Sequence, residues 1–223
     1  MRCTMSTPHF AVFDDFLDAR ELRELWHELR REDYAFINKD VWERVYGLFD
    51  GRPLMGPGVI AGEGASNEQR YPTGRAVDLV VRSILRRKRT LEPWVGRRGS
   101  DWSTLTATPF LYPQESGLGW HADSAQRTGA FTLYVHPTWD PGWGGELLIG
   151  SDHTKRRRPR AGSATVFNER SAVIDAMSLG AFVVPLPNRM VIVKAGVPHR
   201  INTVDRSAGA HLRTSVAGFF VRR

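Results

Sequence analysis

The C-terminal half of the chain is a series of short apolar segments separated by turn residues, and this pattern constrains the fold more than any other feature. The segments are rich in β-branched and aromatic residues, and glycine or proline stands between them. They cover residues 104–112, 130–135, 144–149, 163–167, 189–194 and 212–221. Segments this short, with turn signals at close intervals, are typical of strands in a sandwich or closed barrel. The sequence therefore predicts an all-β body.

The N-terminal part has a different periodicity. Residues 10–13 form a short apolar stretch that predicts a strand. Asp18 and Glu21 have the spacing of a capping box, and apolar residues then recur at helical intervals, so a helix is expected over 19–31. A second helix is expected over 74–90. Both helices are predicted to buttress the outside of the β body. The stretch 33–72 is rich in glycine, proline, asparagine and aspartate, and a lid and a plain surface loop both fit it.

Length and composition indicate one domain that spans residues 1–223. A chain of 223 residues with 41% hydrophobic residues can bury a substantial core. We expect a helical and loop-rich support over 1–103 and a β core over about 104–222. No apolar run approaches the roughly 18 residues of a membrane span, so no membrane partner is expected. The single cysteine, Cys3, excludes an internal disulfide, and the start of the chain has no apolar signal region. These features predict a cytoplasmic protein.

The formal net charge of +7 is concentrated in two basic runs, at residues 86–89 and 155–160. Such runs could contact nucleic acid or an anionic substrate carrier. They could equally be a solvated helix end and a charged loop, and this second interpretation is favoured because charge runs alone identify no partner. A nucleic-acid partner is therefore not expected.

Two histidines and one aspartate are the candidate metal ligands. His121 and Asp123 are two positions apart where a strand is expected to resume, so both side chains would point to one side. His199 follows a turn far downstream. Two imidazoles and a carboxylate form the ligand set that non-haem iron oxygenases use, with three coordination positions left open. His136, His153 and His211 have no carboxylate at a matching spacing and are left out.

Four blocks of sequence resemble the Fe(II)/2-oxoglutarate-dependent dioxygenase superfamily, and in particular its prolyl-hydroxylase-like branch. The resemblance covers roughly residues 104–222. It is carried by Tyr112-Pro113 with Gly119-Trp120-His121-Ala122-Asp123, by Gly144-Gly145-Glu146-Leu147, by Pro198-His199-Arg200-Ile201, and by Leu212-Arg213-Thr214-Ser215-Val216-Ala217-Gly218-Phe219-Phe220.

The resemblance implies a double-stranded β-helix, also called a jelly-roll or cupin-like fold. It also implies roles for seven residues. His121, Asp123 and His199 would hold Fe(II) and form the catalytic centre. Arg213 and Ser215 would bind the far carboxylate of the co-substrate 2-oxoglutarate, with support from Tyr134, and Tyr112 would line the pocket. Molecular oxygen would be the second co-substrate, and ascorbate could support turnover.

Two departures from the family pattern affect these assignments. The interval between His199 and Arg213 is a few residues longer than usual, which leaves Arg206 as a rival anchor. Arg213 is preferred because Ser215 lies at i+2 on the same strand face, whereas Arg206 stands in a turn. The family's usual Tyr-Leu-Asn is replaced by Tyr134-Val135-His136.

The resemblance predicts an enzyme that hydroxylates an unactivated C–H bond of a small molecule and releases succinate and CO2. The substrate would be an amino acid, a carrier-tethered amino acid or a natural-product intermediate. Because Asp123 is present, hydroxylation, desaturation or cyclisation is favoured over halogenation. Three alternatives stay open: a prolyl-type hydroxylase of a protein or peptide, a nucleic-acid demethylase, and a non-catalytic jelly-roll binding protein.

Overall fold

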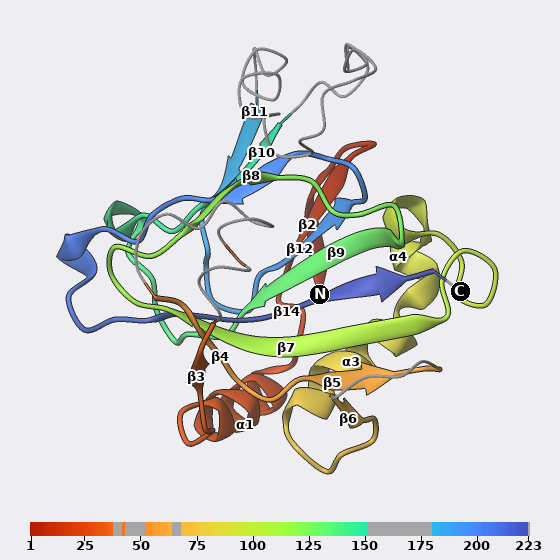
Figure 1. The fold of residues 1–223 in the computed structure, drawn as a ribbon, viewed down its shortest axis with the longest axis horizontal. Helices are drawn as coiled ribbons and strands as arrows, with labels where there is room; N and C mark the ends of the chain where they lie inside the picture. The colour runs from red at the N-terminus through yellow and green to blue at the C-terminus, as the bar shows by residue number, and fades with distance from the viewer. Residues whose placement is uncertain (38–41, 43–51, 64–67, 151–179, 223) are drawn as a thin grey trace.

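The protein folds into two antiparallel β-sheets that face each other across an apolar interior (Figure 1). The fold was obtained as a computed structural model, which describes residues 1–37, 42, 52–63, 68–150 and 180–222. The four-stranded minor sheet has the order β11-β10-β13-β8, and the major sheet has the order β1-β2-β12-β9-β14-β7-β4-β3, with β5 and β6 beside β7.

The strand pairs of the major sheet are antiparallel except for β5 and β6, which pair in parallel. The strands are β1 (Arg2–Ser6), β2 (Phe10–Asp14), β3 (Ala35–Phe36), β4 (Leu54–Met55), β5 (Val59–Ala61), β6 (Gln69–Arg70), β7 (Thr104–Tyr112), β9 (Arg127–Tyr134), β12 (Met190–Lys194) and β14 (Arg213–Val221). Those of the minor sheet are β8 (Leu118–His121), β10 (Leu147–Gly150), β11 (Gly180–Val183) and β13 (His199–Ile201).

The strands from β7 to β14 make the two facing sheets of a jelly roll, so the predicted fold class is confirmed. The description of residues 1–103 as a helical and loop-rich support was incomplete. β2 pairs with β12, and β5 and β4 pair with β7, so the N-terminal part extends the major sheet. The strand at 10–13 was predicted, but β3, β4, β5 and β6 were missed because two or three residues are too few to show a period. β1 was missed because all five of its residues are exposed and show no apolar alternation.

Helices cover the outer face of the major sheet. α1 (Ala19–Leu29) starts at the predicted capping box, in which Asp18 accepts hydrogen bonds from the first turn and Glu21 bonds back to the Asp18 N–H. The helix expected over 74–90 is two helices, α3 (Val77–Arg86) and α4 (Lys88–Val95). The break falls at Arg87, whose φ of −100° and ψ of 11° leave the helical region.

The buried side chains form two clusters, one on each face of the major sheet. The outer cluster joins the sheet to the helices and includes Leu25, Leu29 and Phe220. The inner cluster lies between the two sheets and includes Val191 from the major sheet and Ile149 from the minor sheet. The inner cluster therefore forms the walls around the barrel interior, where the candidate site lies.

Several sequence predictions fall partly or wholly outside the described residues. The strand expected over 163–167 and the basic run 155–160 lie outside them. Within the 33–72 stretch, residues 38–41, 43–51 and 64–67 also lie outside them. The described parts of 33–72 are less irregular than predicted, because they contain β3, β4, β5 and β6. Among the described residues, no helix is long and apolar enough to cross a membrane.

Candidate metal and co-substrate site

The two candidate histidines lie side by side on neighbouring strands of the minor sheet. His121 is the last residue of β8 and His199 the first of β13, and the antiparallel register places them directly opposite. Their ring centroids are 4.4 Å apart. Residues 78 positions apart in the sequence are thus brought together by strand pairing alone.

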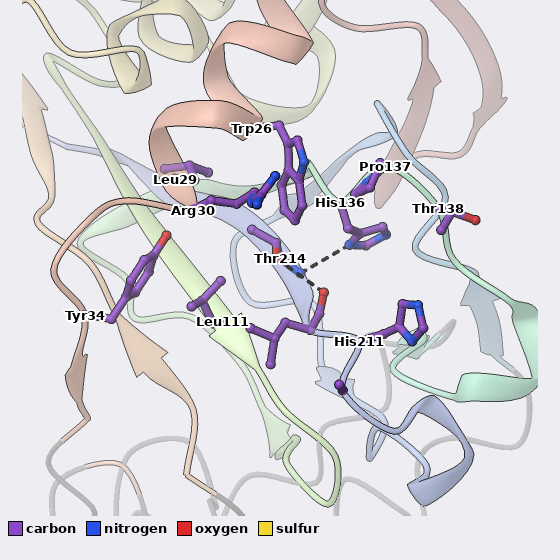
Figure 2. A pocket seen from close by; sticks show the side chains of 12 residues that line it. Trp26, Leu29, Arg30, Tyr34, Leu111, His136, Pro137, Thr138, His211 and Thr214 are labelled. Carbon is purple, nitrogen blue, oxygen red and sulfur yellow. Dashed lines mark hydrogen bonds between the residues drawn. The ribbon is translucent and has the colours of Figure 1, made fainter.

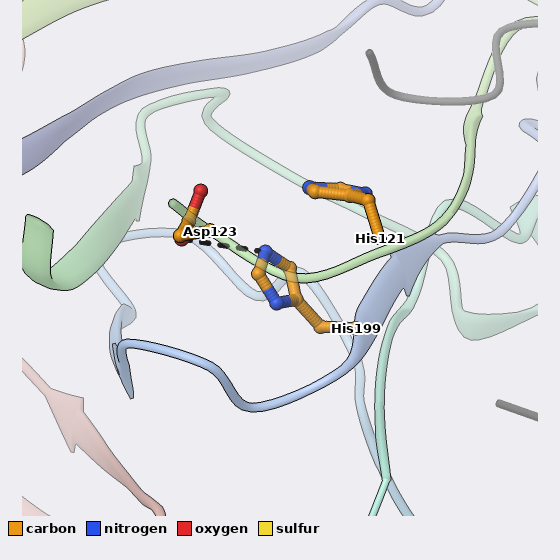
Figure 3. A group of neighbouring side chains, drawn as sticks. All are labelled: His121, Asp123 and His199. Carbon is orange, nitrogen blue, oxygen red and sulfur yellow. Dashed lines mark ion pairs between the residues drawn. The ribbon is translucent and has the colours of Figure 1, made fainter. Parts of the chain in front are cut away.

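Asp123 completes the group. One ligand atom from each of His121, Asp123 and His199 lies within 4.8 Å of the others (Figure 3). The prediction that Asp123 continues the strand of His121 was wrong, because β8 ends at His121 and Asp123 lies in the loop that leads to β9. The side chain nonetheless reaches the histidines, since its burial and an ion pair with Arg127 fix it there.

Each histidine is oriented by its own backbone. His121 Nδ1 lies 2.9 Å from the carbonyl oxygen of Gly119, and His199 Nδ1 lies 2.8 Å from that of Val197. A carbonyl can only accept, so Nδ1 carries the proton and Nε2 carries the lone pair that binds a metal.

The electrostatics favour a neutral His121. The pKa of His121 is lowered to about 3, because the surrounding protein displaces the water that would solvate an imidazolium and because His199 lies alongside. A neutral imidazole is the form that ligates a metal ion.

The carboxylate of Asp123 has two different oxygens. Oδ1 accepts a hydrogen bond from Arg127 Nη1 at 2.8 Å. Oδ2 is buried, has no hydrogen-bond partner among the described residues and lies 4.0 Å from His199 Nε2. A buried carboxylate oxygen without a partner is costly, and a cation between it and the histidines would remove that cost. The three residues therefore fit a divalent metal.

Arg213 lies fully buried on the inner face of the major sheet. Its Nε donates to the carbonyl of Gly145 at 2.8 Å, and its Nη2 donates to Tyr134 Oη at 3.3 Å. The guanidinium lies 5.1 Å from the ring centroid of Tyr112 and 4.8 Å from that of Tyr134. Nη1 has no hydrogen-bond partner in the part of the chain that the structure describes. A buried guanidinium with an unused donor fits a carboxylate ligand.

The neighbours of Arg213 follow from strand register. Tyr112 of β7 is the register partner of Arg213 on β14, and Tyr134 of β9 is the register partner of Ser215 on β14. Arg213 and Ser215 share a face because side chains alternate along β14. Tyr112, Tyr134 and Ser215 are all buried, so the four predicted co-substrate residues are brought together.

Gly145 makes room for Arg213. A Cβ atom at this position would come within 2.9 Å of Arg213 Cδ, and the positive φ of +71° also disfavours other residues. The preceding residue, Gly144, makes a close backbone approach, because a Cβ atom there would clash with the carbonyl oxygen of Thr203.

The rival anchor, Arg206, lies on the surface. It belongs to the short 3-10 turn Arg206–Ala208, and its side chain, 81% exposed, forms an ion pair with Glu115. It does not enter the barrel. The structure thus places Arg213, and not Arg206, among the buried tyrosines.

Comparison with known proteins gives the family. A model of the 2OG-Fe(II) oxygenase superfamily matches residues 108–221, just over half of the chain. The chain belongs to the 2OG-Fe(II) oxygenase superfamily. It is a 2-oxoglutarate-dependent dioxygenase that uses Fe(II) and 2-oxoglutarate. No curated protein sequence matches it.

Solved structures share the fold of this oxygenase at low sequence identity. A prolyl-4-hydroxylase from Pseudomonas putida is 18% identical with a TM-score of 0.62, over 96% of this chain and 94% of that one. HygX from Streptomyces hygroscopicus, with nickel and 2-oxoglutarate bound, is 12% identical with a TM-score of 0.61, over 96% and 83%. A prolyl hydroxylase from Trichoplax adhaerens, in complex with a peptide of hypoxia inducible factor, is 14% identical with a TM-score of 0.57, over 96% and 84%. At these identities the likeness concerns the fold.

A separate pocket of about 400 Å³ lies on the outer side of the major sheet (Figure 2). Its walls include Trp26 and Leu29 of α1, Leu111 of β7 and Thr214 of β14. Leu111 and Thr214 alternate with Tyr112 and Arg213, so the sheet separates this pocket from the barrel interior. It is not the reaction cavity of the oxygenase.

Sequence reasoning missed two residues that shape the site. Arg127 holds Asp123, and the signal was available, because the two stand four positions apart on either side of a turn. His136, on the outer side, accepts a hydrogen bond from the backbone N–H of Thr214, which directly follows Arg213. No sequence pattern marks this second contact.

Proposed function

We propose that this oxygenase hydroxylates an unactivated C–H bond of a small molecule, with Fe(II) held by His121, Asp123 and His199. The observation that carries the metal assignment is the buried Asp123 Oδ2, which finds no hydrogen-bond partner within the described ranges and lies beside two oriented histidines. When bound there, the iron supplies the oxidising chemistry that consumes O2 and 2-oxoglutarate and releases succinate and CO2.

The inner face of β14 anchors the co-substrate in this proposal. Arg213 offers Nη1 to the far carboxylate of 2-oxoglutarate. Tyr134 Oη already accepts from Arg213, so its own proton is available to donate to the same carboxylate. Ser215, on the same face, adds a hydroxyl donor. Tyr112 lines the pocket from the neighbouring strand β7, on the side away from Tyr134.

The presence of Asp123 bears on the outcome of the reaction. A carboxylate ligand occupies the position that a halide would need, so oxidation of the C–H bond by hydroxylation, desaturation or cyclisation is favoured over halogenation. Hydroxylation is the simplest of these outcomes because it needs no second reactive group on the substrate.

The proposed substrate class is an amino acid, a carrier-tethered amino acid or a natural-product intermediate. In support, one similar structure is HygX with hygromycin B bound, and another is the epimerase SnoN from nogalamycin biosynthesis. The second candidate is a prolyl residue of a protein or peptide, which the similarity to two prolyl hydroxylases favours.

Product analysis separates the two candidates. The protein is loaded with Fe(II) under anaerobic conditions and mixed with 2-oxoglutarate, ascorbate and either small molecules or proline-rich peptides. The reaction is then started by exposure to air. We expect succinate formation to rise with a small molecule, which gains one oxygen atom by mass spectrometry, and Asp123→Ala to abolish both signals. Stimulation by the peptides alone would transfer the proposal to the prolyl alternative.

A further inference from the structure

Arg127 is the charged residue that pairs with Asp123 beside the metal site. It is the first residue of β9, and its backbone is paired with Val221 of β14, so it is fixed to the major sheet. Asp123 lies in the loop before it, and the Arg127 N–H closes the intervening turn by donating to the carbonyl of Ser124 at 3.0 Å. Arg127 therefore ties a loop residue to the rigid sheet.

The guanidinium of Arg127 is held from two sides. Nη1 donates to Asp123 Oδ1 at 2.8 Å, and the guanidinium carbon lies 3.3 Å from the ring centroid of Phe219. The side chain is 24% exposed, while that of Asp123 is 1% exposed. A planar cation stacked on an aromatic ring loses little further freedom when it pairs, so the position of Oδ1 is well defined.

This pairing gives the two oxygens of the Asp123 carboxylate different partners. Oδ1 is used by Arg127, and only Oδ2 is directed toward the histidines. A carboxylate can bind a metal through one oxygen or through both. If both oxygens of Asp123 bound, the protein would fill four of the six octahedral positions, and 2-oxoglutarate would fill the remaining two.

We propose that Arg127 keeps Asp123 a one-oxygen ligand and so preserves the third open position on the metal. Arg127 acts through Asp123 and is a positioning residue. This inference rests on the proposed metal site at His121, Asp123 and His199.

The test counts the water molecules on bound Mn²⁺, a redox-stable substitute for Fe(II), by water-proton relaxation. The wild-type protein is compared with Arg127→Gln, which cannot hold Oδ1 as a fixed charged partner. With three positions open in the wild type and two in the variant, we expect the relaxivity per bound Mn²⁺ to fall by about a third. Mn²⁺ affinity is expected to stay within about tenfold, since the second oxygen compensates for the lost orientation.

Arg206→Gln is the matched control, because it removes an arginine–carboxylate ion pair of similar length on the surface. It should leave the relaxivity unchanged. Phe219→Leu, which removes the ring beneath the guanidinium but keeps the charge, should give a smaller decrease than Arg127→Gln.

An unchanged relaxivity per bound Mn²⁺ in Arg127→Gln would overturn the inference. If that variant binds Mn²⁺ too weakly or fails to fold, the same criterion applies to Arg127→Lys, which keeps the charge but loses the planar pairing. Failure of the wild-type protein to bind Mn²⁺ is a different result, and it would remove the metal site itself.

Discussion

His199 and His136 are both buried histidines of the same barrel, but they use their ring nitrogens differently. His199 bonds through Nδ1 to the carbonyl of Val197, and its Nε2 points toward Asp123 (Figure 3). His136 uses both nitrogens within the protein: Nδ1 accepts from the Thr214 N–H and Nε2 donates to the carbonyl of Pro185. A histidine fixed through one nitrogen can serve a ligand, whereas one fixed through both is structural.

Arg213 and Thr214 are neighbours on β14 and show the same contrast. Among the described residues, the Arg213 side chain keeps one donor, Nη1, without a hydrogen-bond partner, whereas the Thr214 backbone N–H, which lies in the plane of the sheet, donates to His136 Nδ1. The Arg213 donor is therefore available to a ligand, and the Thr214 N–H is not.

Removing a ligand histidine should have the largest effect. We expect His199→Ala to weaken Mn²⁺ binding by more than about 100-fold, beyond the range seen when only a neighbour of a ligand is lost. The matched variant His136→Gln should bind Mn²⁺ as the wild type does and lose stability by about 1–3 kcal/mol. Calorimetric titration and urea unfolding measure the two quantities. Equal Mn²⁺ affinity in the wild type and in His199→Ala would break the comparison.

Replacing Arg213 should weaken 2-oxoglutarate binding, whereas replacing Arg206 should not, and this is the second largest effect that we expect. Replacing Arg213 by Gln removes a charge-assisted contact of about 1.5–3 kcal/mol, so 2-oxoglutarate binding to the Mn²⁺-loaded protein should weaken by roughly 10-fold to 150-fold. Arg206→Gln should bind 2-oxoglutarate normally, since Arg206 lies on the surface in an ion pair with Glu115. Competition with a fluorescent or spectroscopic reporter of 2-oxoglutarate binding measures both. Weaker binding in Arg206→Gln alone would reverse the assignment of the anchor.

The pH dependence of stability should reveal His136. Burial, and secondarily the nearby charge of Arg213, lower its pKa to about 4 from the usual 6.5. Below pH 6.5 the unfolded chain binds a proton that the folded protein excludes, so stability falls as the pH drops from about 6.5 to about 4. His136 contributes up to about 1.4 kcal/mol per pH unit to this slope. Urea unfolding of metal-free protein should show a shallower slope for His136→Gln, and an identical slope would contradict this account.

The cap of α1 should give the smallest effect. Asp18→Ala removes the side chain that caps the first turn, at a cost of about 1 kcal/mol. For a protein of this size the melting temperature should fall by about 2–4 °C. Because α1 lies on the outer face of the major sheet, Mn²⁺ and 2-oxoglutarate affinities should not change. A loss of metal affinity would show that the outer layer supports the site more directly than the contacts indicate.

The sequence predicted most of the jelly roll because its strands are long and strongly patterned. β7, β9, β12 and β14 fall where the apolar segments stand, and the capping box marks the start of α1. β3, β4 and β6 have two residues each and give no periodic signal. The break at Arg87 was also missed, because the apolar stripe continues on the helical side across it.

The candidate site was predicted from motif spacing, and its geometry required the fold. The pairing of His121 with His199 depends on the register of two strands far apart in sequence. Asp123 was correctly expected beside His121, but strand alternation is not the cause. β8 ends before Asp123, and the ion pair with Arg127 holds its side chain there. The partners of the histidine Nδ1 atoms are backbone carbonyls, which no side-chain pattern can show.

The most direct test of the central claim is the binding of 2-oxoglutarate to the wild-type protein and to Asp123→Ala, each titrated with and without Mn²⁺. We predict that the wild type binds 2-oxoglutarate far more tightly with Mn²⁺ than without it, and that Asp123→Ala loses this metal dependence. Binding in the wild type that does not depend on the metal, or metal-dependent binding that survives in Asp123→Ala, would contradict the assignment of His121, Asp123 and His199 as the metal site.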